Sequence, residues 1–126
     1  MKILIAEDDQ FLGNALRVKL TNDGNEVILA NDGAQAIAEL EKSVFDLILL
    51  DIVMPEKNGF EVLEAVKSSK KNSKTPTAMI SNLGQAEDVE KAKKLGAIDF
   101  IVKSNVSLAE LSEKIKSLIK PPHAPK

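Results

Sequence analysis

The chain has 126 residues, of which 44% are hydrophobic and 29% are charged. This is the composition of one folded globular domain, and it excludes collagen-like and disordered polymers. Seventeen Lys and Arg residues against nineteen Asp and Glu residues give a net charge of −2, so the chain lacks the overall cationic field that holds DNA, RNA or anionic lipid.

Two residue types that carry much of enzyme chemistry are nearly missing. There is no Cys, which excludes disulfides, thiolate zinc sites and Cys nucleophiles. The single His, His123, lies in the tail from Lys120 to Lys126, which argues against a Ser-His-Asp triad or a histidine-rich metal site. Any chemistry therefore has to rest on carboxylates.

The apolar segments are too short to cross a membrane. None approaches the roughly 20 residues that a membrane helix needs, and the first, at residues 3–6, is followed at once by acidic residues. We therefore expect a cytoplasmic protein with neither an export signal nor a membrane span. The absence of Trp and Tyr also weakens any proposal of base stacking or of a flavin held between rings.

Apolar runs typical of strands buried on both faces alternate with segments of helical spacing. In chain order the expected elements are a strand at Ile3–Ala6, a helix at 12–20, a strand at Val27–Ala30, a helix at 36–40, a strand at Leu47–Leu50, a helix at 62–66, a strand at Ala78–Ile80, a helix at 89–95, a strand at Ile98–Val102 and a helix at 108–118. This alternation predicts an α/β domain with a doubly wound, five-stranded parallel sheet and five helices. The domain is expected to cover residues 1–119, and residues 120–126 to form a Pro-rich tail or linker.

Polar residues gather where the predicted strands end, which is where open α/β sheets bind ligands. They are Glu7, Asp8 and Asp9 after the first apolar run, Asp51 after the third, Ser81 and Asn82 after the fourth, and Lys103 after the fifth. Singly, each has a structural explanation: Asp9 fits a helix N-cap, Asp51 a turn residue and Lys103 a solvated charge. Together, acidic groups, a hydroxyl and an ammonium on one edge favour a functional site.

The residue types of this edge point to a metal and to phosphate chemistry. Carboxylates held close together repel each other, and either a raised pKa or a bound cation relieves that repulsion. Oxygen ligands without His or Cys favour a hard ion, and the expected ion is Mg²⁺. An Asp carboxylate beside Mg²⁺ and a lysine can accept a phosphoryl group, and a chain without a usable His has to obtain that group from elsewhere.

Four motifs resemble the receiver domain of bacterial two-component response regulators, the CheY-like family. They are Ile3-Leu4-Ile5-Ala6-Glu7-Asp8-Asp9, Leu49-Leu50-Asp51-Ile52-Val53-Met54-Pro55 with Gly59 following, Met79-Ile80-Ser81, and Phe100-Ile101-Val102-Lys103. The resemblance covers the chain up to about Ile119. It implies the flavodoxin-like strand order 2-1-3-4-5, with the acidic residues on either side of the point where strand one meets strand three.

The resemblance also implies roles for the acidic residues of the site. Asp51 is the expected phosphoacceptor. Asp8 is expected to bind Mg²⁺ directly and Glu7 to bind it through water, while Asp51 and the backbone carbonyl of Val53 complete the metal-binding set. Asp9 then keeps its role as a helix cap.

The same resemblance assigns the basic, hydroxyl and aromatic residues. Lys103 pairs with Asp51 or its phosphate, Ser81 moves to bond the phosphoryl group, and Phe100 stands where the family keeps a rotating aromatic. The implied partners are a sensor histidine kinase or phosphotransfer protein and an effector that contacts the face of helix four, strand five and helix five. The implied protein is a monomer or a phosphorylation-dependent dimer, with no enzymatic activity beyond its own phosphotransfer and slow autodephosphorylation.

Two positions depart from the family pattern. Asn82 follows Ser81 where a small residue such as Ala is usual, which predicts restricted access of water or a phosphatase to the phosphoryl group. Ser104 follows Lys103 where Pro is common. Because a cis bond before a residue other than Pro costs about 2.5 to 4 kcal/mol, we expect the Lys103–Ser104 bond to be trans and the loop to follow a different path.

Three other functions share features with this one. A flavodoxin-type electron carrier shares the fold, but its flavin phosphate would be repelled by the acidic residues after the first strand. An Asp-nucleophile phosphatase has a second Asp two residues after the nucleophile, where this chain has Val53. A degenerate receiver that binds partners without phosphorylation is less consistent with a full set of chemical residues. The sequence leaves open whether the domain is free-standing or ends at a linker at Pro121-Pro122.

Overall fold

The computed structural model describes residues 1–82 and 86–119, so the predicted tail at 120–126, with His123, lies outside the described residues. In chain order the elements are β1 (Lys2–Ala6), α1 (Gln10–Asn22), β2 (Glu26–Ala30), α2 (Gly33–Lys42), β3 (Leu47–Asp51), α3 (Gly59–Ser68), β4 (Thr77–Ser81), α4 (Ala86–Lys94), β5 (Asp99–Val102), the 3-10 turn η1 (Lys103–Asn105) and α5 (Leu108–Ile119). None of the helices in these ranges is long and apolar enough to cross a membrane.

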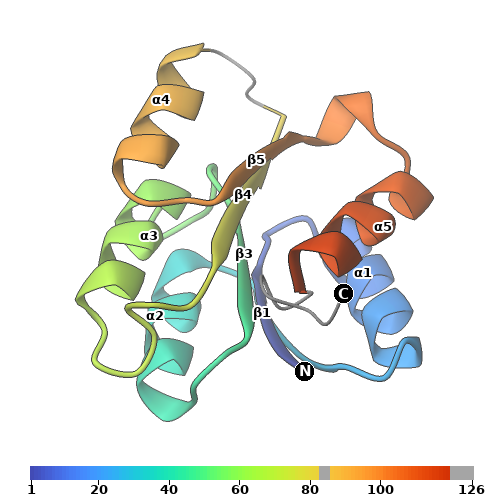
Figure 1. The fold of residues 1–126 in the computed structure, drawn as a ribbon, viewed down its shortest axis with the longest axis horizontal. Coiled ribbons are helices and arrows are strands. Elements are labelled where there is room, and N and C mark those ends of the chain that lie inside the picture. The colour runs from blue at the N-terminus through green and yellow to red at the C-terminus, as the bar shows by residue number, and fades with distance from the viewer. Residues whose placement is uncertain (83–85, 120–126) are drawn as a thin grey trace, which may run out of the picture.

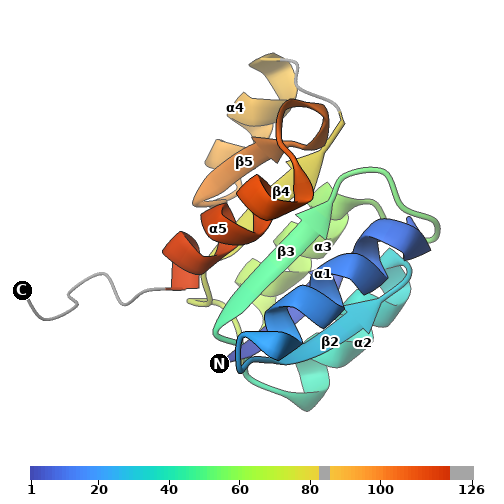
Figure 2. The same cartoon turned by 90° about the vertical axis from the view of Figure 1, so that its right-hand side faces the viewer.

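The strands form one parallel sheet in the order β2-β1-β3-β4-β5, which confirms the predicted doubly wound fold. Helices α1 and α5 cover one face of the sheet, and α2, α3 and α4 cover the other (Figure 1). Figure 2 gives the view from the α1 and α5 side, with the strands running behind these two helices. Each crossover helix returns the chain to the same end of the sheet, so all strands end at one edge.

Successive side chains along each strand point to opposite faces of the sheet, so the hydrophobic core is divided into two parts, one on each face. In β1, Ile3 and Ile5 pack toward α1 and α5, while Leu4 packs on the other side with Leu40 of α2 and Leu63 of α3. The central strands β1 and β3 are buried almost throughout, which explains why their sequences read as continuous apolar runs. The edge strands β2 and β5 are only partly buried.

Side-chain caps set where α1, α2 and α3 begin. Asp9 accepts a hydrogen bond from the Leu12 N–H at the start of α1, as predicted, and Asp32 does the same for Gln35 in α2. Helix α3 opens with a reciprocal capping box between Asn58 and Glu61. These caps fix the first turns of α1, α2 and α3 close to the strand ends from which each helix departs.

The predicted elements exist, and their ends differ by a few residues. Strand β4 extends one residue beyond the predicted run at each end, because Thr77 and Ser81 are buried and pair with neighbours. The 3-10 turn η1 was not predicted, since three residues have no apolar periodicity. The described residues contain no cis peptide bond, so the Lys103–Ser104 bond is trans as predicted.

A buried asparagine ties together the loops at the opposite edge of the sheet. Asn72 is fully buried, and its amide donates to the carbonyl oxygens of Leu40 and Ser43 at 3.0 and 2.8 Å. Its Oδ1 accepts from the Phe45 N–H at 2.9 Å and from the Thr75 hydroxyl at 3.1 Å. The Asn72 side chain thus satisfies three backbone groups between the end of α2 and the start of β3, and it links this segment to the α3–β4 loop.

Candidate functional site

One pocket at the carboxyl edge of the sheet contains the predicted chemical residues. It has a volume of about 230 Å³. Its lining comprises Glu7, Asp8, Asp9, Asp51, Val53, Ser81, Asn82 and Lys103. The prediction that these residues meet at one edge is therefore correct. Phe100, the predicted switch residue, lies outside this lining and is half-buried on the edge strand β5.

The strand register explains why residues far apart in the sequence meet here. Ala6 of β1 pairs with Leu50 of β3, which is the adjacent strand. Glu7 and Asp51, the residues that follow this pair, therefore lie side by side. Asp51 is the last residue of β3 and is 5% exposed. Ser81 ends β4 and pairs with Val102, the residue before Lys103. The side chains of the pocket thus come from four consecutive strand ends across the sheet.

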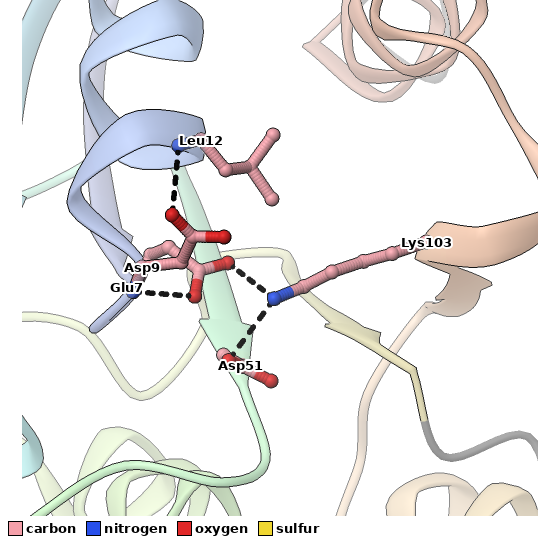
Figure 3. A network of polar contacts seen from close by, with 5 residues as sticks. All are labelled: Glu7, Asp9, Leu12, Asp51 and Lys103. Carbon is pink, nitrogen blue, oxygen red and sulfur yellow. Dashed lines mark hydrogen bonds and ion pairs between the residues drawn. The ribbon is translucent and has the colours of Figure 1, made fainter.

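Lys103 bridges two buried carboxylates (Figure 3). Its Nζ lies 2.6 Å from Glu7 Oε1 and 3.1 Å from Asp51 Oδ2. The Glu7 side chain is fully buried and that of Lys103 is 13% exposed, so solvent screens these ion pairs weakly. The sequence predicted the contact with Asp51 but missed the shorter contact with Glu7, because no sequence pattern states which of two neighbouring carboxylates a long side chain reaches.

Burial and the neighbouring charges shift two pKa values. Burial of the Glu7 carboxylate, together with the nearby Asp51, raises the pKa of Glu7 to about 7, although Lys103 acts in the opposite direction. Burial alone would lower the pKa of Lys103, but its bonds to Glu7 and the charge of Asp51 outweigh burial and raise it. Lys103 is therefore a fixed positive charge at neutral pH, whereas Glu7 titrates in the physiological range.

The carboxylates fit a divalent cation. One oxygen each from Glu7, Asp8 and Asp51 can be grouped so that all lie within 4.8 Å of one another. Among residues 1–82 and 86–119, the buried Glu7 Oε1 lacks a well-oriented hydrogen-bond donor and has only the ion pair with Lys103. Its other oxygen accepts from the Asp9 N–H at 3.2 Å. An all-oxygen set with a net negative charge, in which Glu7 Oε1 is paired only with Lys103, matches the ligand preference of Mg²⁺.

A second groove, of about 590 Å³, runs along α1 and is larger than the acidic pocket. It is mainly apolar and is lined by residues such as Phe11, Val18 and Leu108, which are 87%, 49% and 42% exposed. It contains no group of carboxylates, so size alone does not identify the chemical site. The chemical site is instead identified by the convergence of charged groups with perturbed pKa values in the acidic pocket.

Comparison with known proteins decides between the functions that share this fold. The family model described as "Response regulator receiver domain" matches residues 3–116. The chain belongs to this family. The electron-carrier and phosphatase alternatives are therefore set aside, and the domain is a receiver of two-component signalling.

The curated relatives of this receiver domain include longer regulators. It is 37% identical over 120 residues to the transcriptional regulatory protein CiaR of Streptococcus pneumoniae, with 95% of this chain and 52% of the relative covered. It is 36% identical over 122 residues to the transcriptional regulatory protein CpxR of Escherichia coli, covering 97% and 50% of the two chains. The chain thus spans about half the length of the curated relatives it matches.

Solved structures agree with the family assignment. The non-phosphorylated HemR receiver domain of Leptospira biflexa is 29% identical, with a TM-score of 0.86 and with 97% of this chain and 98% of that chain covered. The chemotaxis protein CheY4 of Vibrio cholerae is also 29% identical, with a TM-score of 0.85 and coverage of 93% and 97%. The receiver domain therefore shares both strand order and overall shape with these proteins.

The raised pKa of Glu7 predicts a pH dependence of stability in the metal-free domain. The pKa of Glu7 is about 7 in the folded state, against an ordinary value of 4.5, so between these pH values the folded state binds more protons than the unfolded state. The free energy of unfolding should therefore fall as the pH rises through this window, by roughly 3 kcal/mol from this group. Glu7→Gln should remove that fall in urea titrations without divalent metal.

The exposed Glu64 of α3 offers a matched control for this substitution. Glu64→Gln should keep the wild-type pH dependence of the unfolding free energy, because that side chain is not buried beside other charges. Equal slopes in wild type and Glu7→Gln would contradict the assignment of the titration to Glu7.

Proposed function

We propose that this receiver domain accepts a phosphoryl group on Asp51 from a histidine kinase or phosphotransfer protein. The observation that carries the proposal is the buried Asp51 carboxylate, 3.1 Å from the Lys103 ammonium and grouped with Glu7 and Asp8. The carboxylate oxygen attacks phosphorus as the phosphorus–nitrogen bond of the donor histidine breaks. That nitrogen keeps the electron pair and is reprotonated by solvent, and an aspartyl phosphate is formed.

The acidic residues would hold the metal that this reaction needs. Asp8, Asp51 and the Val53 carbonyl are the proposed direct ligands, with Glu7 acting through water; all four residues line the pocket. When bound, Mg²⁺ neutralises charge on the phosphoryl oxygens. Asp8 is the exposed member of the group, so a cation can reach the pocket from solvent.

Lys103 supports the reaction by its fixed position. Its contact with the buried Glu7 keeps the ammonium beside Asp51 before any phosphoryl group arrives. A cation that is already placed and partly desolvated stabilises developing negative charge without reorganisation. The proposed role of Glu7 is thus twofold, since it orients Lys103 and contributes to the metal site.

The proposed response to phosphorylation runs through Ser81 and Phe100. Ser81 is buried at the end of β4, within the pocket, and it pairs with Val102 of β5. A phosphoryl group on Asp51 offers new acceptor oxygens to the Ser81 hydroxyl. Movement of Ser81 would let the half-buried Phe100 rotate and would change the face formed by α4, β5 and α5, which an effector would contact.

Asn82 bears on how long the phosphorylated state lasts. It is exposed and lines the pocket together with Asp51 and Ser81. We infer that it restricts the approach of the water that hydrolyses an aspartyl phosphate. Autodephosphorylation would then be slow, and the domain, as a monomer or a phosphorylation-dependent dimer, would hold its signal.

The first prediction of this proposal concerns the acceptor. Incubation with acetyl phosphate and Mg²⁺ should add one phosphoryl group to the wild-type chain, seen as a shift in intact mass. Asp51→Asn should abolish the shift because the amide is not a nucleophile. Asp32→Asn, which keeps a competent N-cap on α2 outside the pocket, should leave it unchanged. Labelling retained in Asp51→Asn would identify a different acceptor, and no labelling in wild type would favour the degenerate receiver.

The second prediction concerns the metal. Mg²⁺ should raise the free energy of unfolding by about 2.7 kcal/mol at a hundredfold excess over its Kd, because it binds the folded state. Asp8→Ala should remove this gain and, by relieving carboxylate repulsion, should leave the metal-free variant at least as stable as metal-free wild type. Glu90→Ala, at an exposed acidic residue of α4, is the control. A wild-type melting temperature independent of Mg²⁺ would contradict the site.

The third prediction concerns the switch. Addition of a phosphate mimic should change amide chemical shifts at the pocket and also along β5 and the adjacent faces of α4 and α5. Ser81→Ala should keep the changes around Asp51 and lose those around Phe100, because the hydroxyl that links the two is missing. Changes confined to the loops around Asp51 in the wild type would refute the conformational part of the proposal.

A further inference from the structure

The first residue of α2 touches the loop that follows Asp51. Gly33 is buried, and its N–H donates to the Pro55 carbonyl at 3.2 Å. A Cβ on Gly33 would overlap the Lys57 carbonyl oxygen and would lie 2.5 Å from Lys57 Cβ and 2.6 Å from its carbonyl carbon. Two of these three neighbours are backbone atoms, which cannot rotate away, so any side chain at position 33 has to displace the loop.

The contacted loop has a tight and unusual backbone. Lys57 N–H also donates to the Pro55 carbonyl, at 2.8 Å, which closes a three-residue γ-turn. The central residue, Glu56, has a φ of 70°, a region that residues other than Gly rarely adopt. Such a turn persists only where its surroundings hold it. The Gly33 N–H, bound to the same carbonyl oxygen, is one of those surroundings.

The other end of the loop is fixed on Asp51 itself. Gly59 N–H donates to the Ile52 carbonyl at 2.8 Å. A Cβ on Gly59 would overlap the Asp51 carbonyl oxygen and would lie 2.8 Å from Ile52 Cα. The loop of residues 52–58, which carries Val53 in the pocket lining, is therefore held between two glycines from two helices that pack side by side (Figure 1).

We propose that Gly33 is a positioning residue for the metal site: its missing side chain lets the start of α2 hold the loop where Val53 and Asp51 line the same pocket. This inference rests on the proposed function, since the affected property is Mg²⁺ binding. Sequence alone marks Gly33 only as part of a turn signal, Asn31-Asp32-Gly33, and gives no connection with Asp51. The connection arises from the packing of α2 against the loop.

The test is the Mg²⁺ affinity of the Gly33→Ala variant of the full chain. A methyl group should move the loop and weaken Mg²⁺ binding by roughly tenfold to a hundredfold, the range seen when residues that orient metal ligands are changed. Gly96→Ala is the control, because its φ of 97° makes Ala strained at a position whose nearest neighbours are Lys67 side-chain atoms. That variant should lose stability and keep the wild-type Mg²⁺ affinity.

A measurement on the wild type covers the case in which Gly33→Ala does not fold. Binding is reciprocal, so Mg²⁺ should slow hydrogen exchange of the Gly33 amide more than that of the Gly96 amide, which donates to Lys93. Equal slowing of both amides, or a folded Gly33→Ala variant with wild-type affinity, would overturn the role of Gly33 alone. Absence of Mg²⁺ binding in the wild type would instead overturn the proposed function.

Discussion

The buried ion pair between Lys103 and Glu7 is the contact on which the rest of the site depends. Three carboxylates, from Glu7, Asp8 and Asp51, meet one ammonium, so the group carries an excess of negative charge at the end of an apolar sheet. Removing either partner of a buried pair leaves an uncompensated charge, which is far more costly than the pair is favourable. The pair therefore fixes geometry more than it adds stability, and it leaves room for a cation.

The fold tolerates this repulsion among carboxylates because the hydrophobic core, and not the charged site, supplies its stability. Strands β1 and β3 bury apolar side chains on both faces, and at the opposite edge the Asn72 side chain satisfies backbone groups of residues 40–45. Each buried aliphatic side chain contributes about 1.5–3 kcal/mol, so a few such residues offset the repulsion among carboxylates. At one edge of the sheet the buried polar groups are thus hydrogen-bonded to each other, whereas the other edge holds the repelling carboxylates of the site.

Much of this arrangement could be predicted from the sequence, for physical reasons that differ between its parts. The strands were readable because burial on both faces requires unbroken apolar runs, and the site because Asp51, Ser81 and Lys103 each follow or end such a run. The shorter contact of Lys103 with Glu7, and the lack of space for a side chain on Gly33 beside the loop, depend on how the elements pack in three dimensions. No pattern of residue types records that packing.

The position of β5 gives a physical reason why the proposed phosphorylation at the pocket would affect the face formed by α4, β5 and α5. Lys103 follows directly after this strand, and Phe100, within the strand, lies three residues before Lys103. One short segment therefore carries both groups. As an edge strand β5 pairs only with β4 in the described sheet, and it is only partly buried, whereas β3 is buried throughout. Segments with fewer buried contacts move at lower cost in free energy. Under the proposed function, a change of charge at Asp51 would act on Lys103, and the partly buried β5 next to Lys103 would move at lower cost than the fully buried β3, which carries Asp51.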